Sequence, residues 1–110
     1  MIAKILLDYL NEHLSVPAYM EAHSELTDYV LIDQTGSSRE NQITTTTLAI
    51  QSYGDTLYNA MLLNESVKQA MDGFLQLPQV ARVELQTDYN FTNTTTKQYR
   101  WQAVFLITHY

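Results

Sequence analysis

The sequence predicts an α+β domain in which helices pack on one face of a four-stranded antiparallel sheet. Two segments repeat apolar residues at the 3.6-residue period of an α-helix, and four others are β-branched or alternate apolar with polar residues. Their order along the chain, α-β-β-α-β-β, is typical of an antiparallel sheet with its helices on one side. A length of 110 residues without a Pro/Gly-rich linker indicates a single domain, residues 1–110.

The first helix is expected over residues 2–14. One helical stripe carries Ile2, Ile5, Leu6, Tyr9, Leu10 and His13. Val16-Pro17 then ends the helix, because proline disfavours the helical backbone for the residue before it.

Two strands are expected next, over residues 29–33 and 42–52. The first is the β-rich run Tyr-Val-Leu-Ile-Asp, and the second is rich in isoleucine and threonine. Thr35-Gly36-Ser37-Ser38 between them is a turn signal, so the second strand should pair back on the first.

A second helix is expected to begin near Ser52–Asp55, because both of these residues are good N-caps, and to end at Leu77-Pro78. Its stripe is Leu57, Ala60, Met61, Asn64, Val67, Met71 and Phe74. We expect a core in which Leu57, Met61, Val67, Met71 and Phe74 face Leu85, Phe105 and Ile107.

Two long strands, residues 81–92 and 98–110, alternate apolar and polar side chains around the polar tip 93–96. A twelve-residue strand spans roughly 40 Å. A domain of this size has a radius of gyration of about 13 Å. This hairpin must therefore bend or project, which makes residues 89–98 a candidate contact arm.

Charge and composition exclude several classes of function. The net charge of −6 falls entirely on residues 1–55, with eight acids against two bases. This balance disfavours a grip on nucleic acid and a polybasic membrane anchor. The absence of cysteine excludes disulfides and thiolate metal sites. No apolar run approaches the ~20 residues that span a bilayer. Residues 1–8 turn acidic too early for a signal peptide, so we expect a cytosolic chain.

Candidate catalytic groups are sparse. The segment 21–25 holds Glu21, His23 and Glu25, which are metal-ligating residue types. On a helix His23 would point away from the two carboxylates, so a solvated acidic loop is a better interpretation than a metal site. His109 is interpreted as a sheet residue, and Trp101 as a half-buried strand aromatic rather than a stacking platform. We therefore expect no catalytic residues, no metal and no cofactor.

The layout resembles a known family. The strings Val16-Pro17-Ala18-Tyr19, Tyr29–Ile32, Gly36–Glu40, Ala49–Tyr53, Val83–Phe91 and Tyr99–Phe105 carry the resemblance over nearly the whole chain. Together they look like the small tail-terminator and minor structural proteins of long-tailed, non-contractile bacteriophages, which are also labelled minor capsid or tail-completion proteins.

The resemblance implies assembly without catalysis. Proteins of that family have an α+β fold and form a six-membered ring on the head-proximal end of the tail tube. The ring stops growth of the tube and offers a surface to the head connector. The implied partners are copies of the chain itself, the tail-tube protein and the head–tail connector. DNA would only pass through the bore, and no membrane is involved. The implied location is the host cytoplasm during assembly and then the tail or neck of the virion.

Two polar segments are the candidate assembly interface. Residues 35–42 include Arg39, the sole base between Lys4 and Lys68, and we expect this loop to be mobile in the free subunit and buried in the assembly. The candidate residues are Ser37, Ser38, Arg39 and Glu40 from this loop and Asn93, Thr94, Thr95 and Lys97 from the arm.

Two alternatives stay open: a small ligand-binding or regulatory α+β domain that dimerises through its sheet, and a cofactor-free enzyme with a site between sheet and helices. A pocket with converging polar groups would favour these two, and a flat body with projecting hairpins favours the ring protein.

Overall fold

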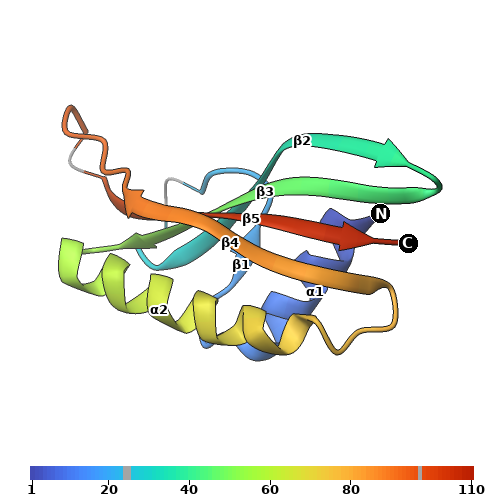
Figure 1. Cartoon of the computed structure of the whole chain (residues 1–110). Coiled ribbons are helices and arrows are strands. Elements are labelled where there is room, and N and C mark those ends of the chain that lie inside the picture. Colours follow the sequence, from blue (N-terminus) through green and yellow to red (C-terminus); the bar gives the residue numbers. More distant parts are fainter. Residues whose placement is uncertain (24–25, 97) are drawn as a thin grey trace.

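The computed structural model describes residues 1–23, 26–96 and 98–110 (Figure 1). In chain order its elements are α1 Ile2–His13, β1 Ala18–Tyr19, β2 Tyr29–Glu40, β3 Ile43–Gly54, α2 Leu57–Phe74, β4 Val80–Asn90 and β5 Tyr99–His109. The predicted α+β class is confirmed, and the limits of both helices agree with the predicted ones to within a few residues.

The sheet is five-stranded and mixed within the described residues, in the order β1-β2-β3-β5-β4. The prediction of four antiparallel strands missed β1, which pairs in parallel with Val30 and Leu31 of β2. Pro17 explains this strand, since it ends the helical path and its carbonyl accepts a hydrogen bond from the Val30 amide at 3.0 Å. The other strand pairs are antiparallel.

Both helices lie on one face of the sheet, and the core fills the space between them (Figure 1). Directly paired residues share a face, so Ile32, Ile50 and Ala103 lie side by side across β2, β3 and β5. α1 buries Ile2, Ala3, Leu6 and Leu10. His13, expected on the same stripe, is exposed and stacks on the Tyr9 ring instead.

α2 begins just after the predicted entry Ser52–Asp55. Ser52 lies within β3, and Thr56 is the N-cap that accepts a hydrogen bond from the Asn59 amide. The tight passage from β3 to α2 requires glycine at position 54, where a Cβ would come within 2.6 Å of the Ala60 nitrogen. The helix buries Ala60, Asn64, Val67, Met71 and Phe74.

Part of the predicted core is wrong. Phe74, Phe105 and Ile107 are buried as expected, but Met61 is 43% exposed and Leu85 41% exposed. Met61 lies about 100° around the helix from Ala60, which takes the buried position. Leu85 belongs to the edge strand β4, where the covering helix does not shield it.

The predicted turn at Thr35–Ser38 is also wrong. β2 continues through these residues to Glu40, with a register shift between Gln34 and Gly36. The turn is formed by Asn41 and Gln42, whose φ angles of 51° and 66° fit a two-residue hairpin turn with left-handed backbone conformation at both positions. Small polar residues such as Ser37 are as acceptable on an exposed strand as in a turn, so composition alone misplaced the reversal.

The molecule measures 44 × 25 × 21 Å. The β2–β3 turn and the β4–β5 connection lie at opposite ends of its long axis (Figure 1). The β4–β5 hairpin, expected to bend or project, has register irregularities between Val80 and Arg82 and between Leu85 and Thr87, a feature that bends strands. Among the described residues, no helix has the length and apolar character needed to cross a membrane.

Candidate assembly surfaces

The β2–β3 tip, residues 33–43, carries the first predicted group of interface residues. Ser37, Ser38, Arg39 and Glu40 are all exposed, and they belong to a run of eleven consecutive exposed residues. Arg39 has no ion-pair partner among the described residues. The segment is a paired strand rather than the loop that we expected, so its side chains are held in a defined register.

The β4–β5 tip, the connection between Asn90 and Tyr99, carries the second group of predicted interface residues. The Asn93 side chain accepts hydrogen bonds from the backbone amides of Thr95 and Thr96 at 3.1 and 3.3 Å, and the Asn93 and Gln98 backbones bond to each other. These bonds give the connection a local turn structure with Thr94 and Thr95 exposed. Lys97, the last predicted interface residue, lies outside the described residues.

The structure does not bring the two groups together. They lie at opposite ends of the molecule, so no single partner surface of ordinary size would cover both (Figure 1). One copy therefore presents two different surfaces, which is the arrangement that a head-to-tail contact requires.

Arg100 organises the face of the sheet that the helices leave open. Its Nε donates to the Phe91 carbonyl at 2.6 Å and one terminal nitrogen donates to the Tyr53 hydroxyl at 3.1 Å. The guanidinium carbon lies 4.5 Å from the centre of the Phe91 ring, a cation–π contact. The Tyr53 ring in turn stacks on Tyr29 at 4.4 Å, and burial raises the pKa of Tyr29.

A row of side-chain hydrogen bonds extends from this cluster across the sheet. The Tyr53 hydroxyl donates to Gln51, the Gln51 amide donates to Gln102, and the Gln102 amide donates to the Tyr89 hydroxyl. Both glutamines are buried. The row ties β3, β5 and β4 together and stiffens the end of the sheet from which the β4–β5 tip extends. Sequence reasoning missed it, although a glutamine within an apolar strand, at position 51, was a usable signal.

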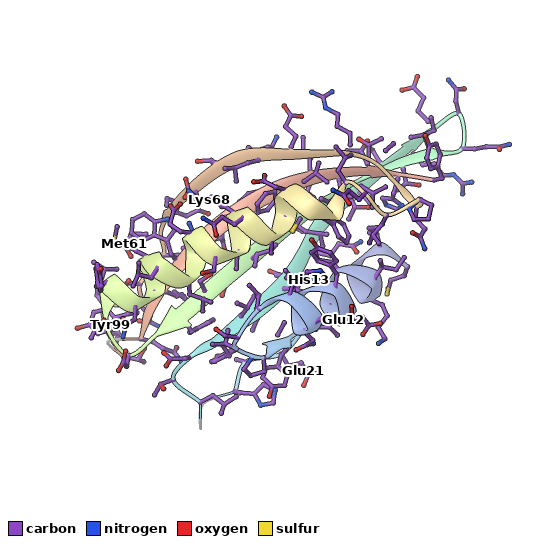
Figure 2. All side chains as sticks on the ribbon, turned by 90° about the horizontal axis from the view of Figure 1, so that it is seen from below. Glu12, His13, Glu21, Met61, Lys68 and Tyr99 are labelled. Carbon is purple, nitrogen blue, oxygen red and sulfur yellow. The ribbon has the colours of Figure 1, made fainter. Side chains whose placement is uncertain are left out.

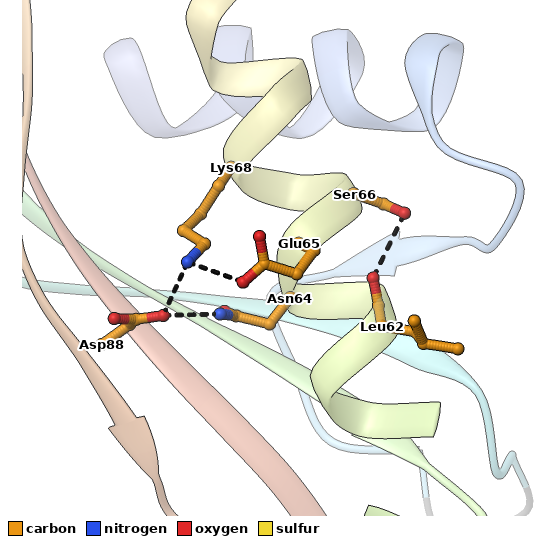
Figure 3. A network of polar contacts seen from close by, with 6 residues as sticks. All are labelled: Leu62, Asn64, Glu65, Ser66, Lys68 and Asp88. Carbon is orange, nitrogen blue, oxygen red and sulfur yellow. Dashed lines mark hydrogen bonds and ion pairs between the residues drawn. The ribbon is translucent and has the colours of Figure 1, made fainter. Parts of the chain in front are cut away.

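On the helix face, Asp88 joins α2 to the edge strand β4 (Figure 3). It accepts hydrogen bonds from Asn64 Nδ2 at 2.9 Å and from Lys68 Nζ at 3.0 Å, and Lys68 also contacts Glu65 at 2.8 Å. The hydrogen bond from Lys68 is the main cause that lowers the pKa of Asp88. Glu65 and then Asp88 raise the pKa of Lys68.

An apolar surface lies beside this ion pair. Tyr58, Met61 and Leu62, here called the α2 patch, are 68%, 43% and 49% exposed. With the half-buried Trp101 they line a hollow of about 160 Å³, which Glu65 and Asp88 also line. Contiguous exposed apolar side chains of this kind mark interaction sites. The sequence signal was a second apolar stripe beside the core stripe, at i and i+3/i+4.

The residues with potential chemistry are scattered. His109 Nε2 lies 2.9 Å from the Thr46 hydroxyl, and His23 packs against the Tyr19 ring at 3.8 Å. Figure 2 shows Glu12 and His13 at the end of α1 and Glu21 on the following segment. Glu25, which belongs to the segment weighed as a metal site, lies outside the described residues. Within the described part of the chain, no three acidic, histidine or cysteine side chains gather as a metal site would need.

A hollow of about 610 Å³ lies between the helices. It is lined by Tyr9, His13, Gln69 and Gly73 among others, and it is open to solvent. A search with models of protein families and a search of curated proteins found nothing that matches this chain.

Proposed function

We propose that this chain is a structural protein of a phage virion, a tail terminator that caps the head-proximal end of the tail tube and offers a joining surface to the head. One observation carries the proposal: an elongated α+β subunit exposes two different hairpin surfaces at its opposite ends (Figure 1). The resemblance of the sequence to tail-terminator proteins supports the same function.

The geometry suits a ring because two unlike ends allow a heterologous contact. When the rotation between neighbouring copies closes, such contacts generate a ring, and the contact then repeats at every subunit. Six copies would bind the end of the tube through many modest interfaces at once, which together give a stable cap.

The charge also suits a passage for DNA. Each copy brings a net charge of −6, all of it within residues 1–55. Phosphate is repelled by such a surface, so DNA would pass a ring of these subunits without binding to it. High acidity also favours solubility, and for that reason the charge supports the proposal without carrying it.

Electron microscopy of particles from a strain with an early stop codon in this gene tests the proposal. We expect tails of uncontrolled length, or tails that never join heads, because an uncapped tube end keeps recruiting subunits. A strain with a synonymous change at the same codon is the control. Normal tails on full heads, with infectivity intact, would overturn the proposal.

The ligand-binding alternative rests on the hollow between α1 and α2, whose volume of about 610 Å³ lies in the range of small-molecule sites. It predicts a phage-independent role and a subunit that dimerises through its open sheet face. The same stop-codon strain separates the two functions, because a ligand-binding domain would leave tail length unchanged.

A further inference from the structure

We propose that two copies of the free protein pair through the sheet face that the helices leave open. The Glu40 end of this face, with Glu40 and Ile43, packs on the Arg100 end of the second copy, with Arg100, Phe91 and Tyr89. The two ends lie near the β2–β3 turn and the β4–β5 connection, at opposite ends of the molecule (Figure 1). The dimer is a state of the free chain and does not rest on the proposed function.

The strand register places both ends on the same face of the sheet. Ile43 and Tyr53 are ten residues apart in β3, and an even separation along a strand puts two side chains on one face. Glu40 pairs directly with Ile43, and Arg100 pairs directly with Tyr53, so both share that face. Ile50, an odd number of residues from Ile43 and Tyr53, faces the helices and belongs to the core instead.

The Glu40 end combines negative charge with exposed apolar surface. Ile43 is 41% exposed, and Glu40 has no ion-pair partner among the described residues. Arg39 precedes Glu40 in the strand and therefore points to the other face. Arg82 of β4 lies at the same end of the sheet but contacts Glu84 at 3.6 Å. This end therefore keeps an uncompensated carboxylate beside an aliphatic side chain.

The Arg100 end carries a cation without a carboxylate. Hydrogen bonds to the Phe91 carbonyl and the Tyr53 hydroxyl hold the Arg100 side chain, and its guanidinium lies over the Phe91 ring. No acid pairs with it in the part of the chain that the structure describes. Phe91 and Tyr89 beside it are 38% and 39% exposed. A fixed guanidinium flanked by exposed aromatic rings fits a carboxylate next to an aliphatic side chain, which the other end of the face offers.

The middle of the face can be covered without leaving polar groups unpaired. Its two buried glutamines, Gln51 and Gln102, already bond to each other and to the tyrosines beside them. Leu31, Val104 and Leu106 lie on this face and are only half-buried, so a second sheet packed on them would remove apolar surface from water. The two largest dimensions of the molecule, 44 and 25 Å, allow a face of the about 800 Å² that each partner of a stable complex buries.

Symmetry favours a second copy of this chain as the occupant. A two-fold axis across the middle of the face turns the second copy end for end, so Glu40 of each copy meets Arg100 of the other and every contact is made twice. A two-fold axis along the strands would instead oppose Glu40 to Glu40 and Arg100 to Arg100, which like charges disfavour. The end-for-end dimer uses both ends of each copy and is therefore closed.

Cysteine cross-linking tests the contact directly, because the native chain contains no cysteine. Under mild oxidation, purified I43C/F91C should give a disulfide-linked dimer and nothing larger. An equal mixture of the single variants I43C and F91C should also give linked dimers. Each single variant alone should stay unlinked, because its two cysteines lie at opposite ends of the dimer. I43C/Q69C is the matched control, since Gln69 is exposed on α2, on the other side of the sheet.

Linked dimers from I43C/F91C and from the mixture, with none from I43C/Q69C, support the proposal. No linked species from I43C/F91C at any concentration up to the solubility limit overturns it. Linked species larger than a dimer, or dimers from I43C alone, overturn the end-for-end symmetry and the proposal with it.

Sedimentation equilibrium tests the charges. E40R should raise the dissociation constant of the dimer about tenfold, and E40R/R100E should restore it, because the exchanged charges attract again. E12R is the matched control, since it makes the same charge change at an exposed position of α1, on the other side of the sheet. An unchanged constant in E40R, or an equal rise in E12R, would overturn the proposal. The cross-links decide alone if R100E prevents folding.

The dimer and the proposed function can fail separately. A protein that stays monomeric in these experiments overturns only the dimer. Normal tails in the stop-codon strain overturn the tail-terminator function, whatever the cross-links show. The ligand-binding alternative also expects a dimer through this face, so tail length, and not the dimer, separates the two functions.

Discussion

Removing the Asp88 carboxylate should destabilise the fold through the helix partner that it leaves behind. In Asp88→Ala, Asn64 loses the acceptor of its Nδ2 hydrogen bond, and Asn64 is only 1% exposed. Its Oδ1 already has no hydrogen-bond partner among the described residues. A buried amide without partners costs about 1–3 kcal/mol. Lys68 keeps its ion pair with Glu65 and reaches solvent, so losing the Lys68–Asp88 contact adds about 0–1 kcal/mol.

We therefore expect Asp88→Ala to lower the free energy of unfolding by about 2–3 kcal/mol in urea melts with an unchanged m-value. Asp88→Asn should lower it by about 1 kcal/mol, because it keeps an acceptor for Asn64 and loses only the charge. Glu84→Ala is the matched control on the same strand. Glu84 is exposed and forms one long ion pair, 3.6 Å, with the exposed Arg82, so its loss should cost little. A loss from Asp88→Ala no larger than that from Glu84→Ala would refute the reasoning.

The pH dependence gives a second test of the same site. The folded-state pKa of Asp88 lies below the ordinary value of 3.8, chiefly because of the hydrogen bond from Lys68. The stabilisation from its charge is therefore fully present above the unfolded pKa and is lost as pH falls through the folded one. The stability difference between the native chain and Asp88→Asn should be constant near neutral pH and shrink below about pH 4. A difference that stays constant through this range would contradict the role of the charge.

Five further substitutions test the packing and the turns in denaturation experiments. Phe74→Ala or Phe105→Ala should lower stability by about 3–5 kcal/mol, whereas Met61→Ala should change it by less than about 0.5 kcal/mol; equal losses would contradict the burial of these side chains. Gln42→Gly should raise stability by about 0.5–1 kcal/mol, since its φ of 66° suits glycine better, and a lower thermal midpoint would contradict this. Gly54→Ala should lower the thermal midpoint because the new Cβ would lie 2.6 Å from a backbone nitrogen of α2, and an unchanged midpoint would show that this junction yields.

Periodic segments were predictable because period follows from local geometry. The stripe of residues 2–14 became α1, and the alternation over 98–110 became β5. β1 was not predictable, since two residues have no period and its pairing depends on Val30, far along the chain. The turn was misplaced because Gly36 is a strong local signal, whereas Asn41-Gln42 contains no glycine and is held in its left-handed conformation by the strand pairing on either side.

The candidate surfaces were also predictable only where local sequence determines them. Of the residues chosen for their polar composition, 37–40, Thr94 and Thr95 are exposed, whereas Asn93 is half-buried. The row that joins Gln51 to Gln102 depends on the register between strands that are distant in sequence, which no local pattern contains. Met61 was assigned to the core because a stripe does not show how wide a strip of helix the sheet will cover, and here the covered strip ends at Ala60.

The strand order has a consequence for how the subunit folds while it is being synthesised. β5 follows every other strand in the chain, yet it lies between β3 and β4, and it pairs Thr44 with His109. Contacts between such distant residues form slowly, because a long loop must close before they contribute. On the ribosome, Leu48 and Ile50 of β3 must therefore wait, without their β5 neighbours, until residues 99–109 have been made. A chain cut short before Tyr99 cannot complete the middle of its sheet, so prematurely ended copies are expected to be degraded or to aggregate before they can enter an assembly.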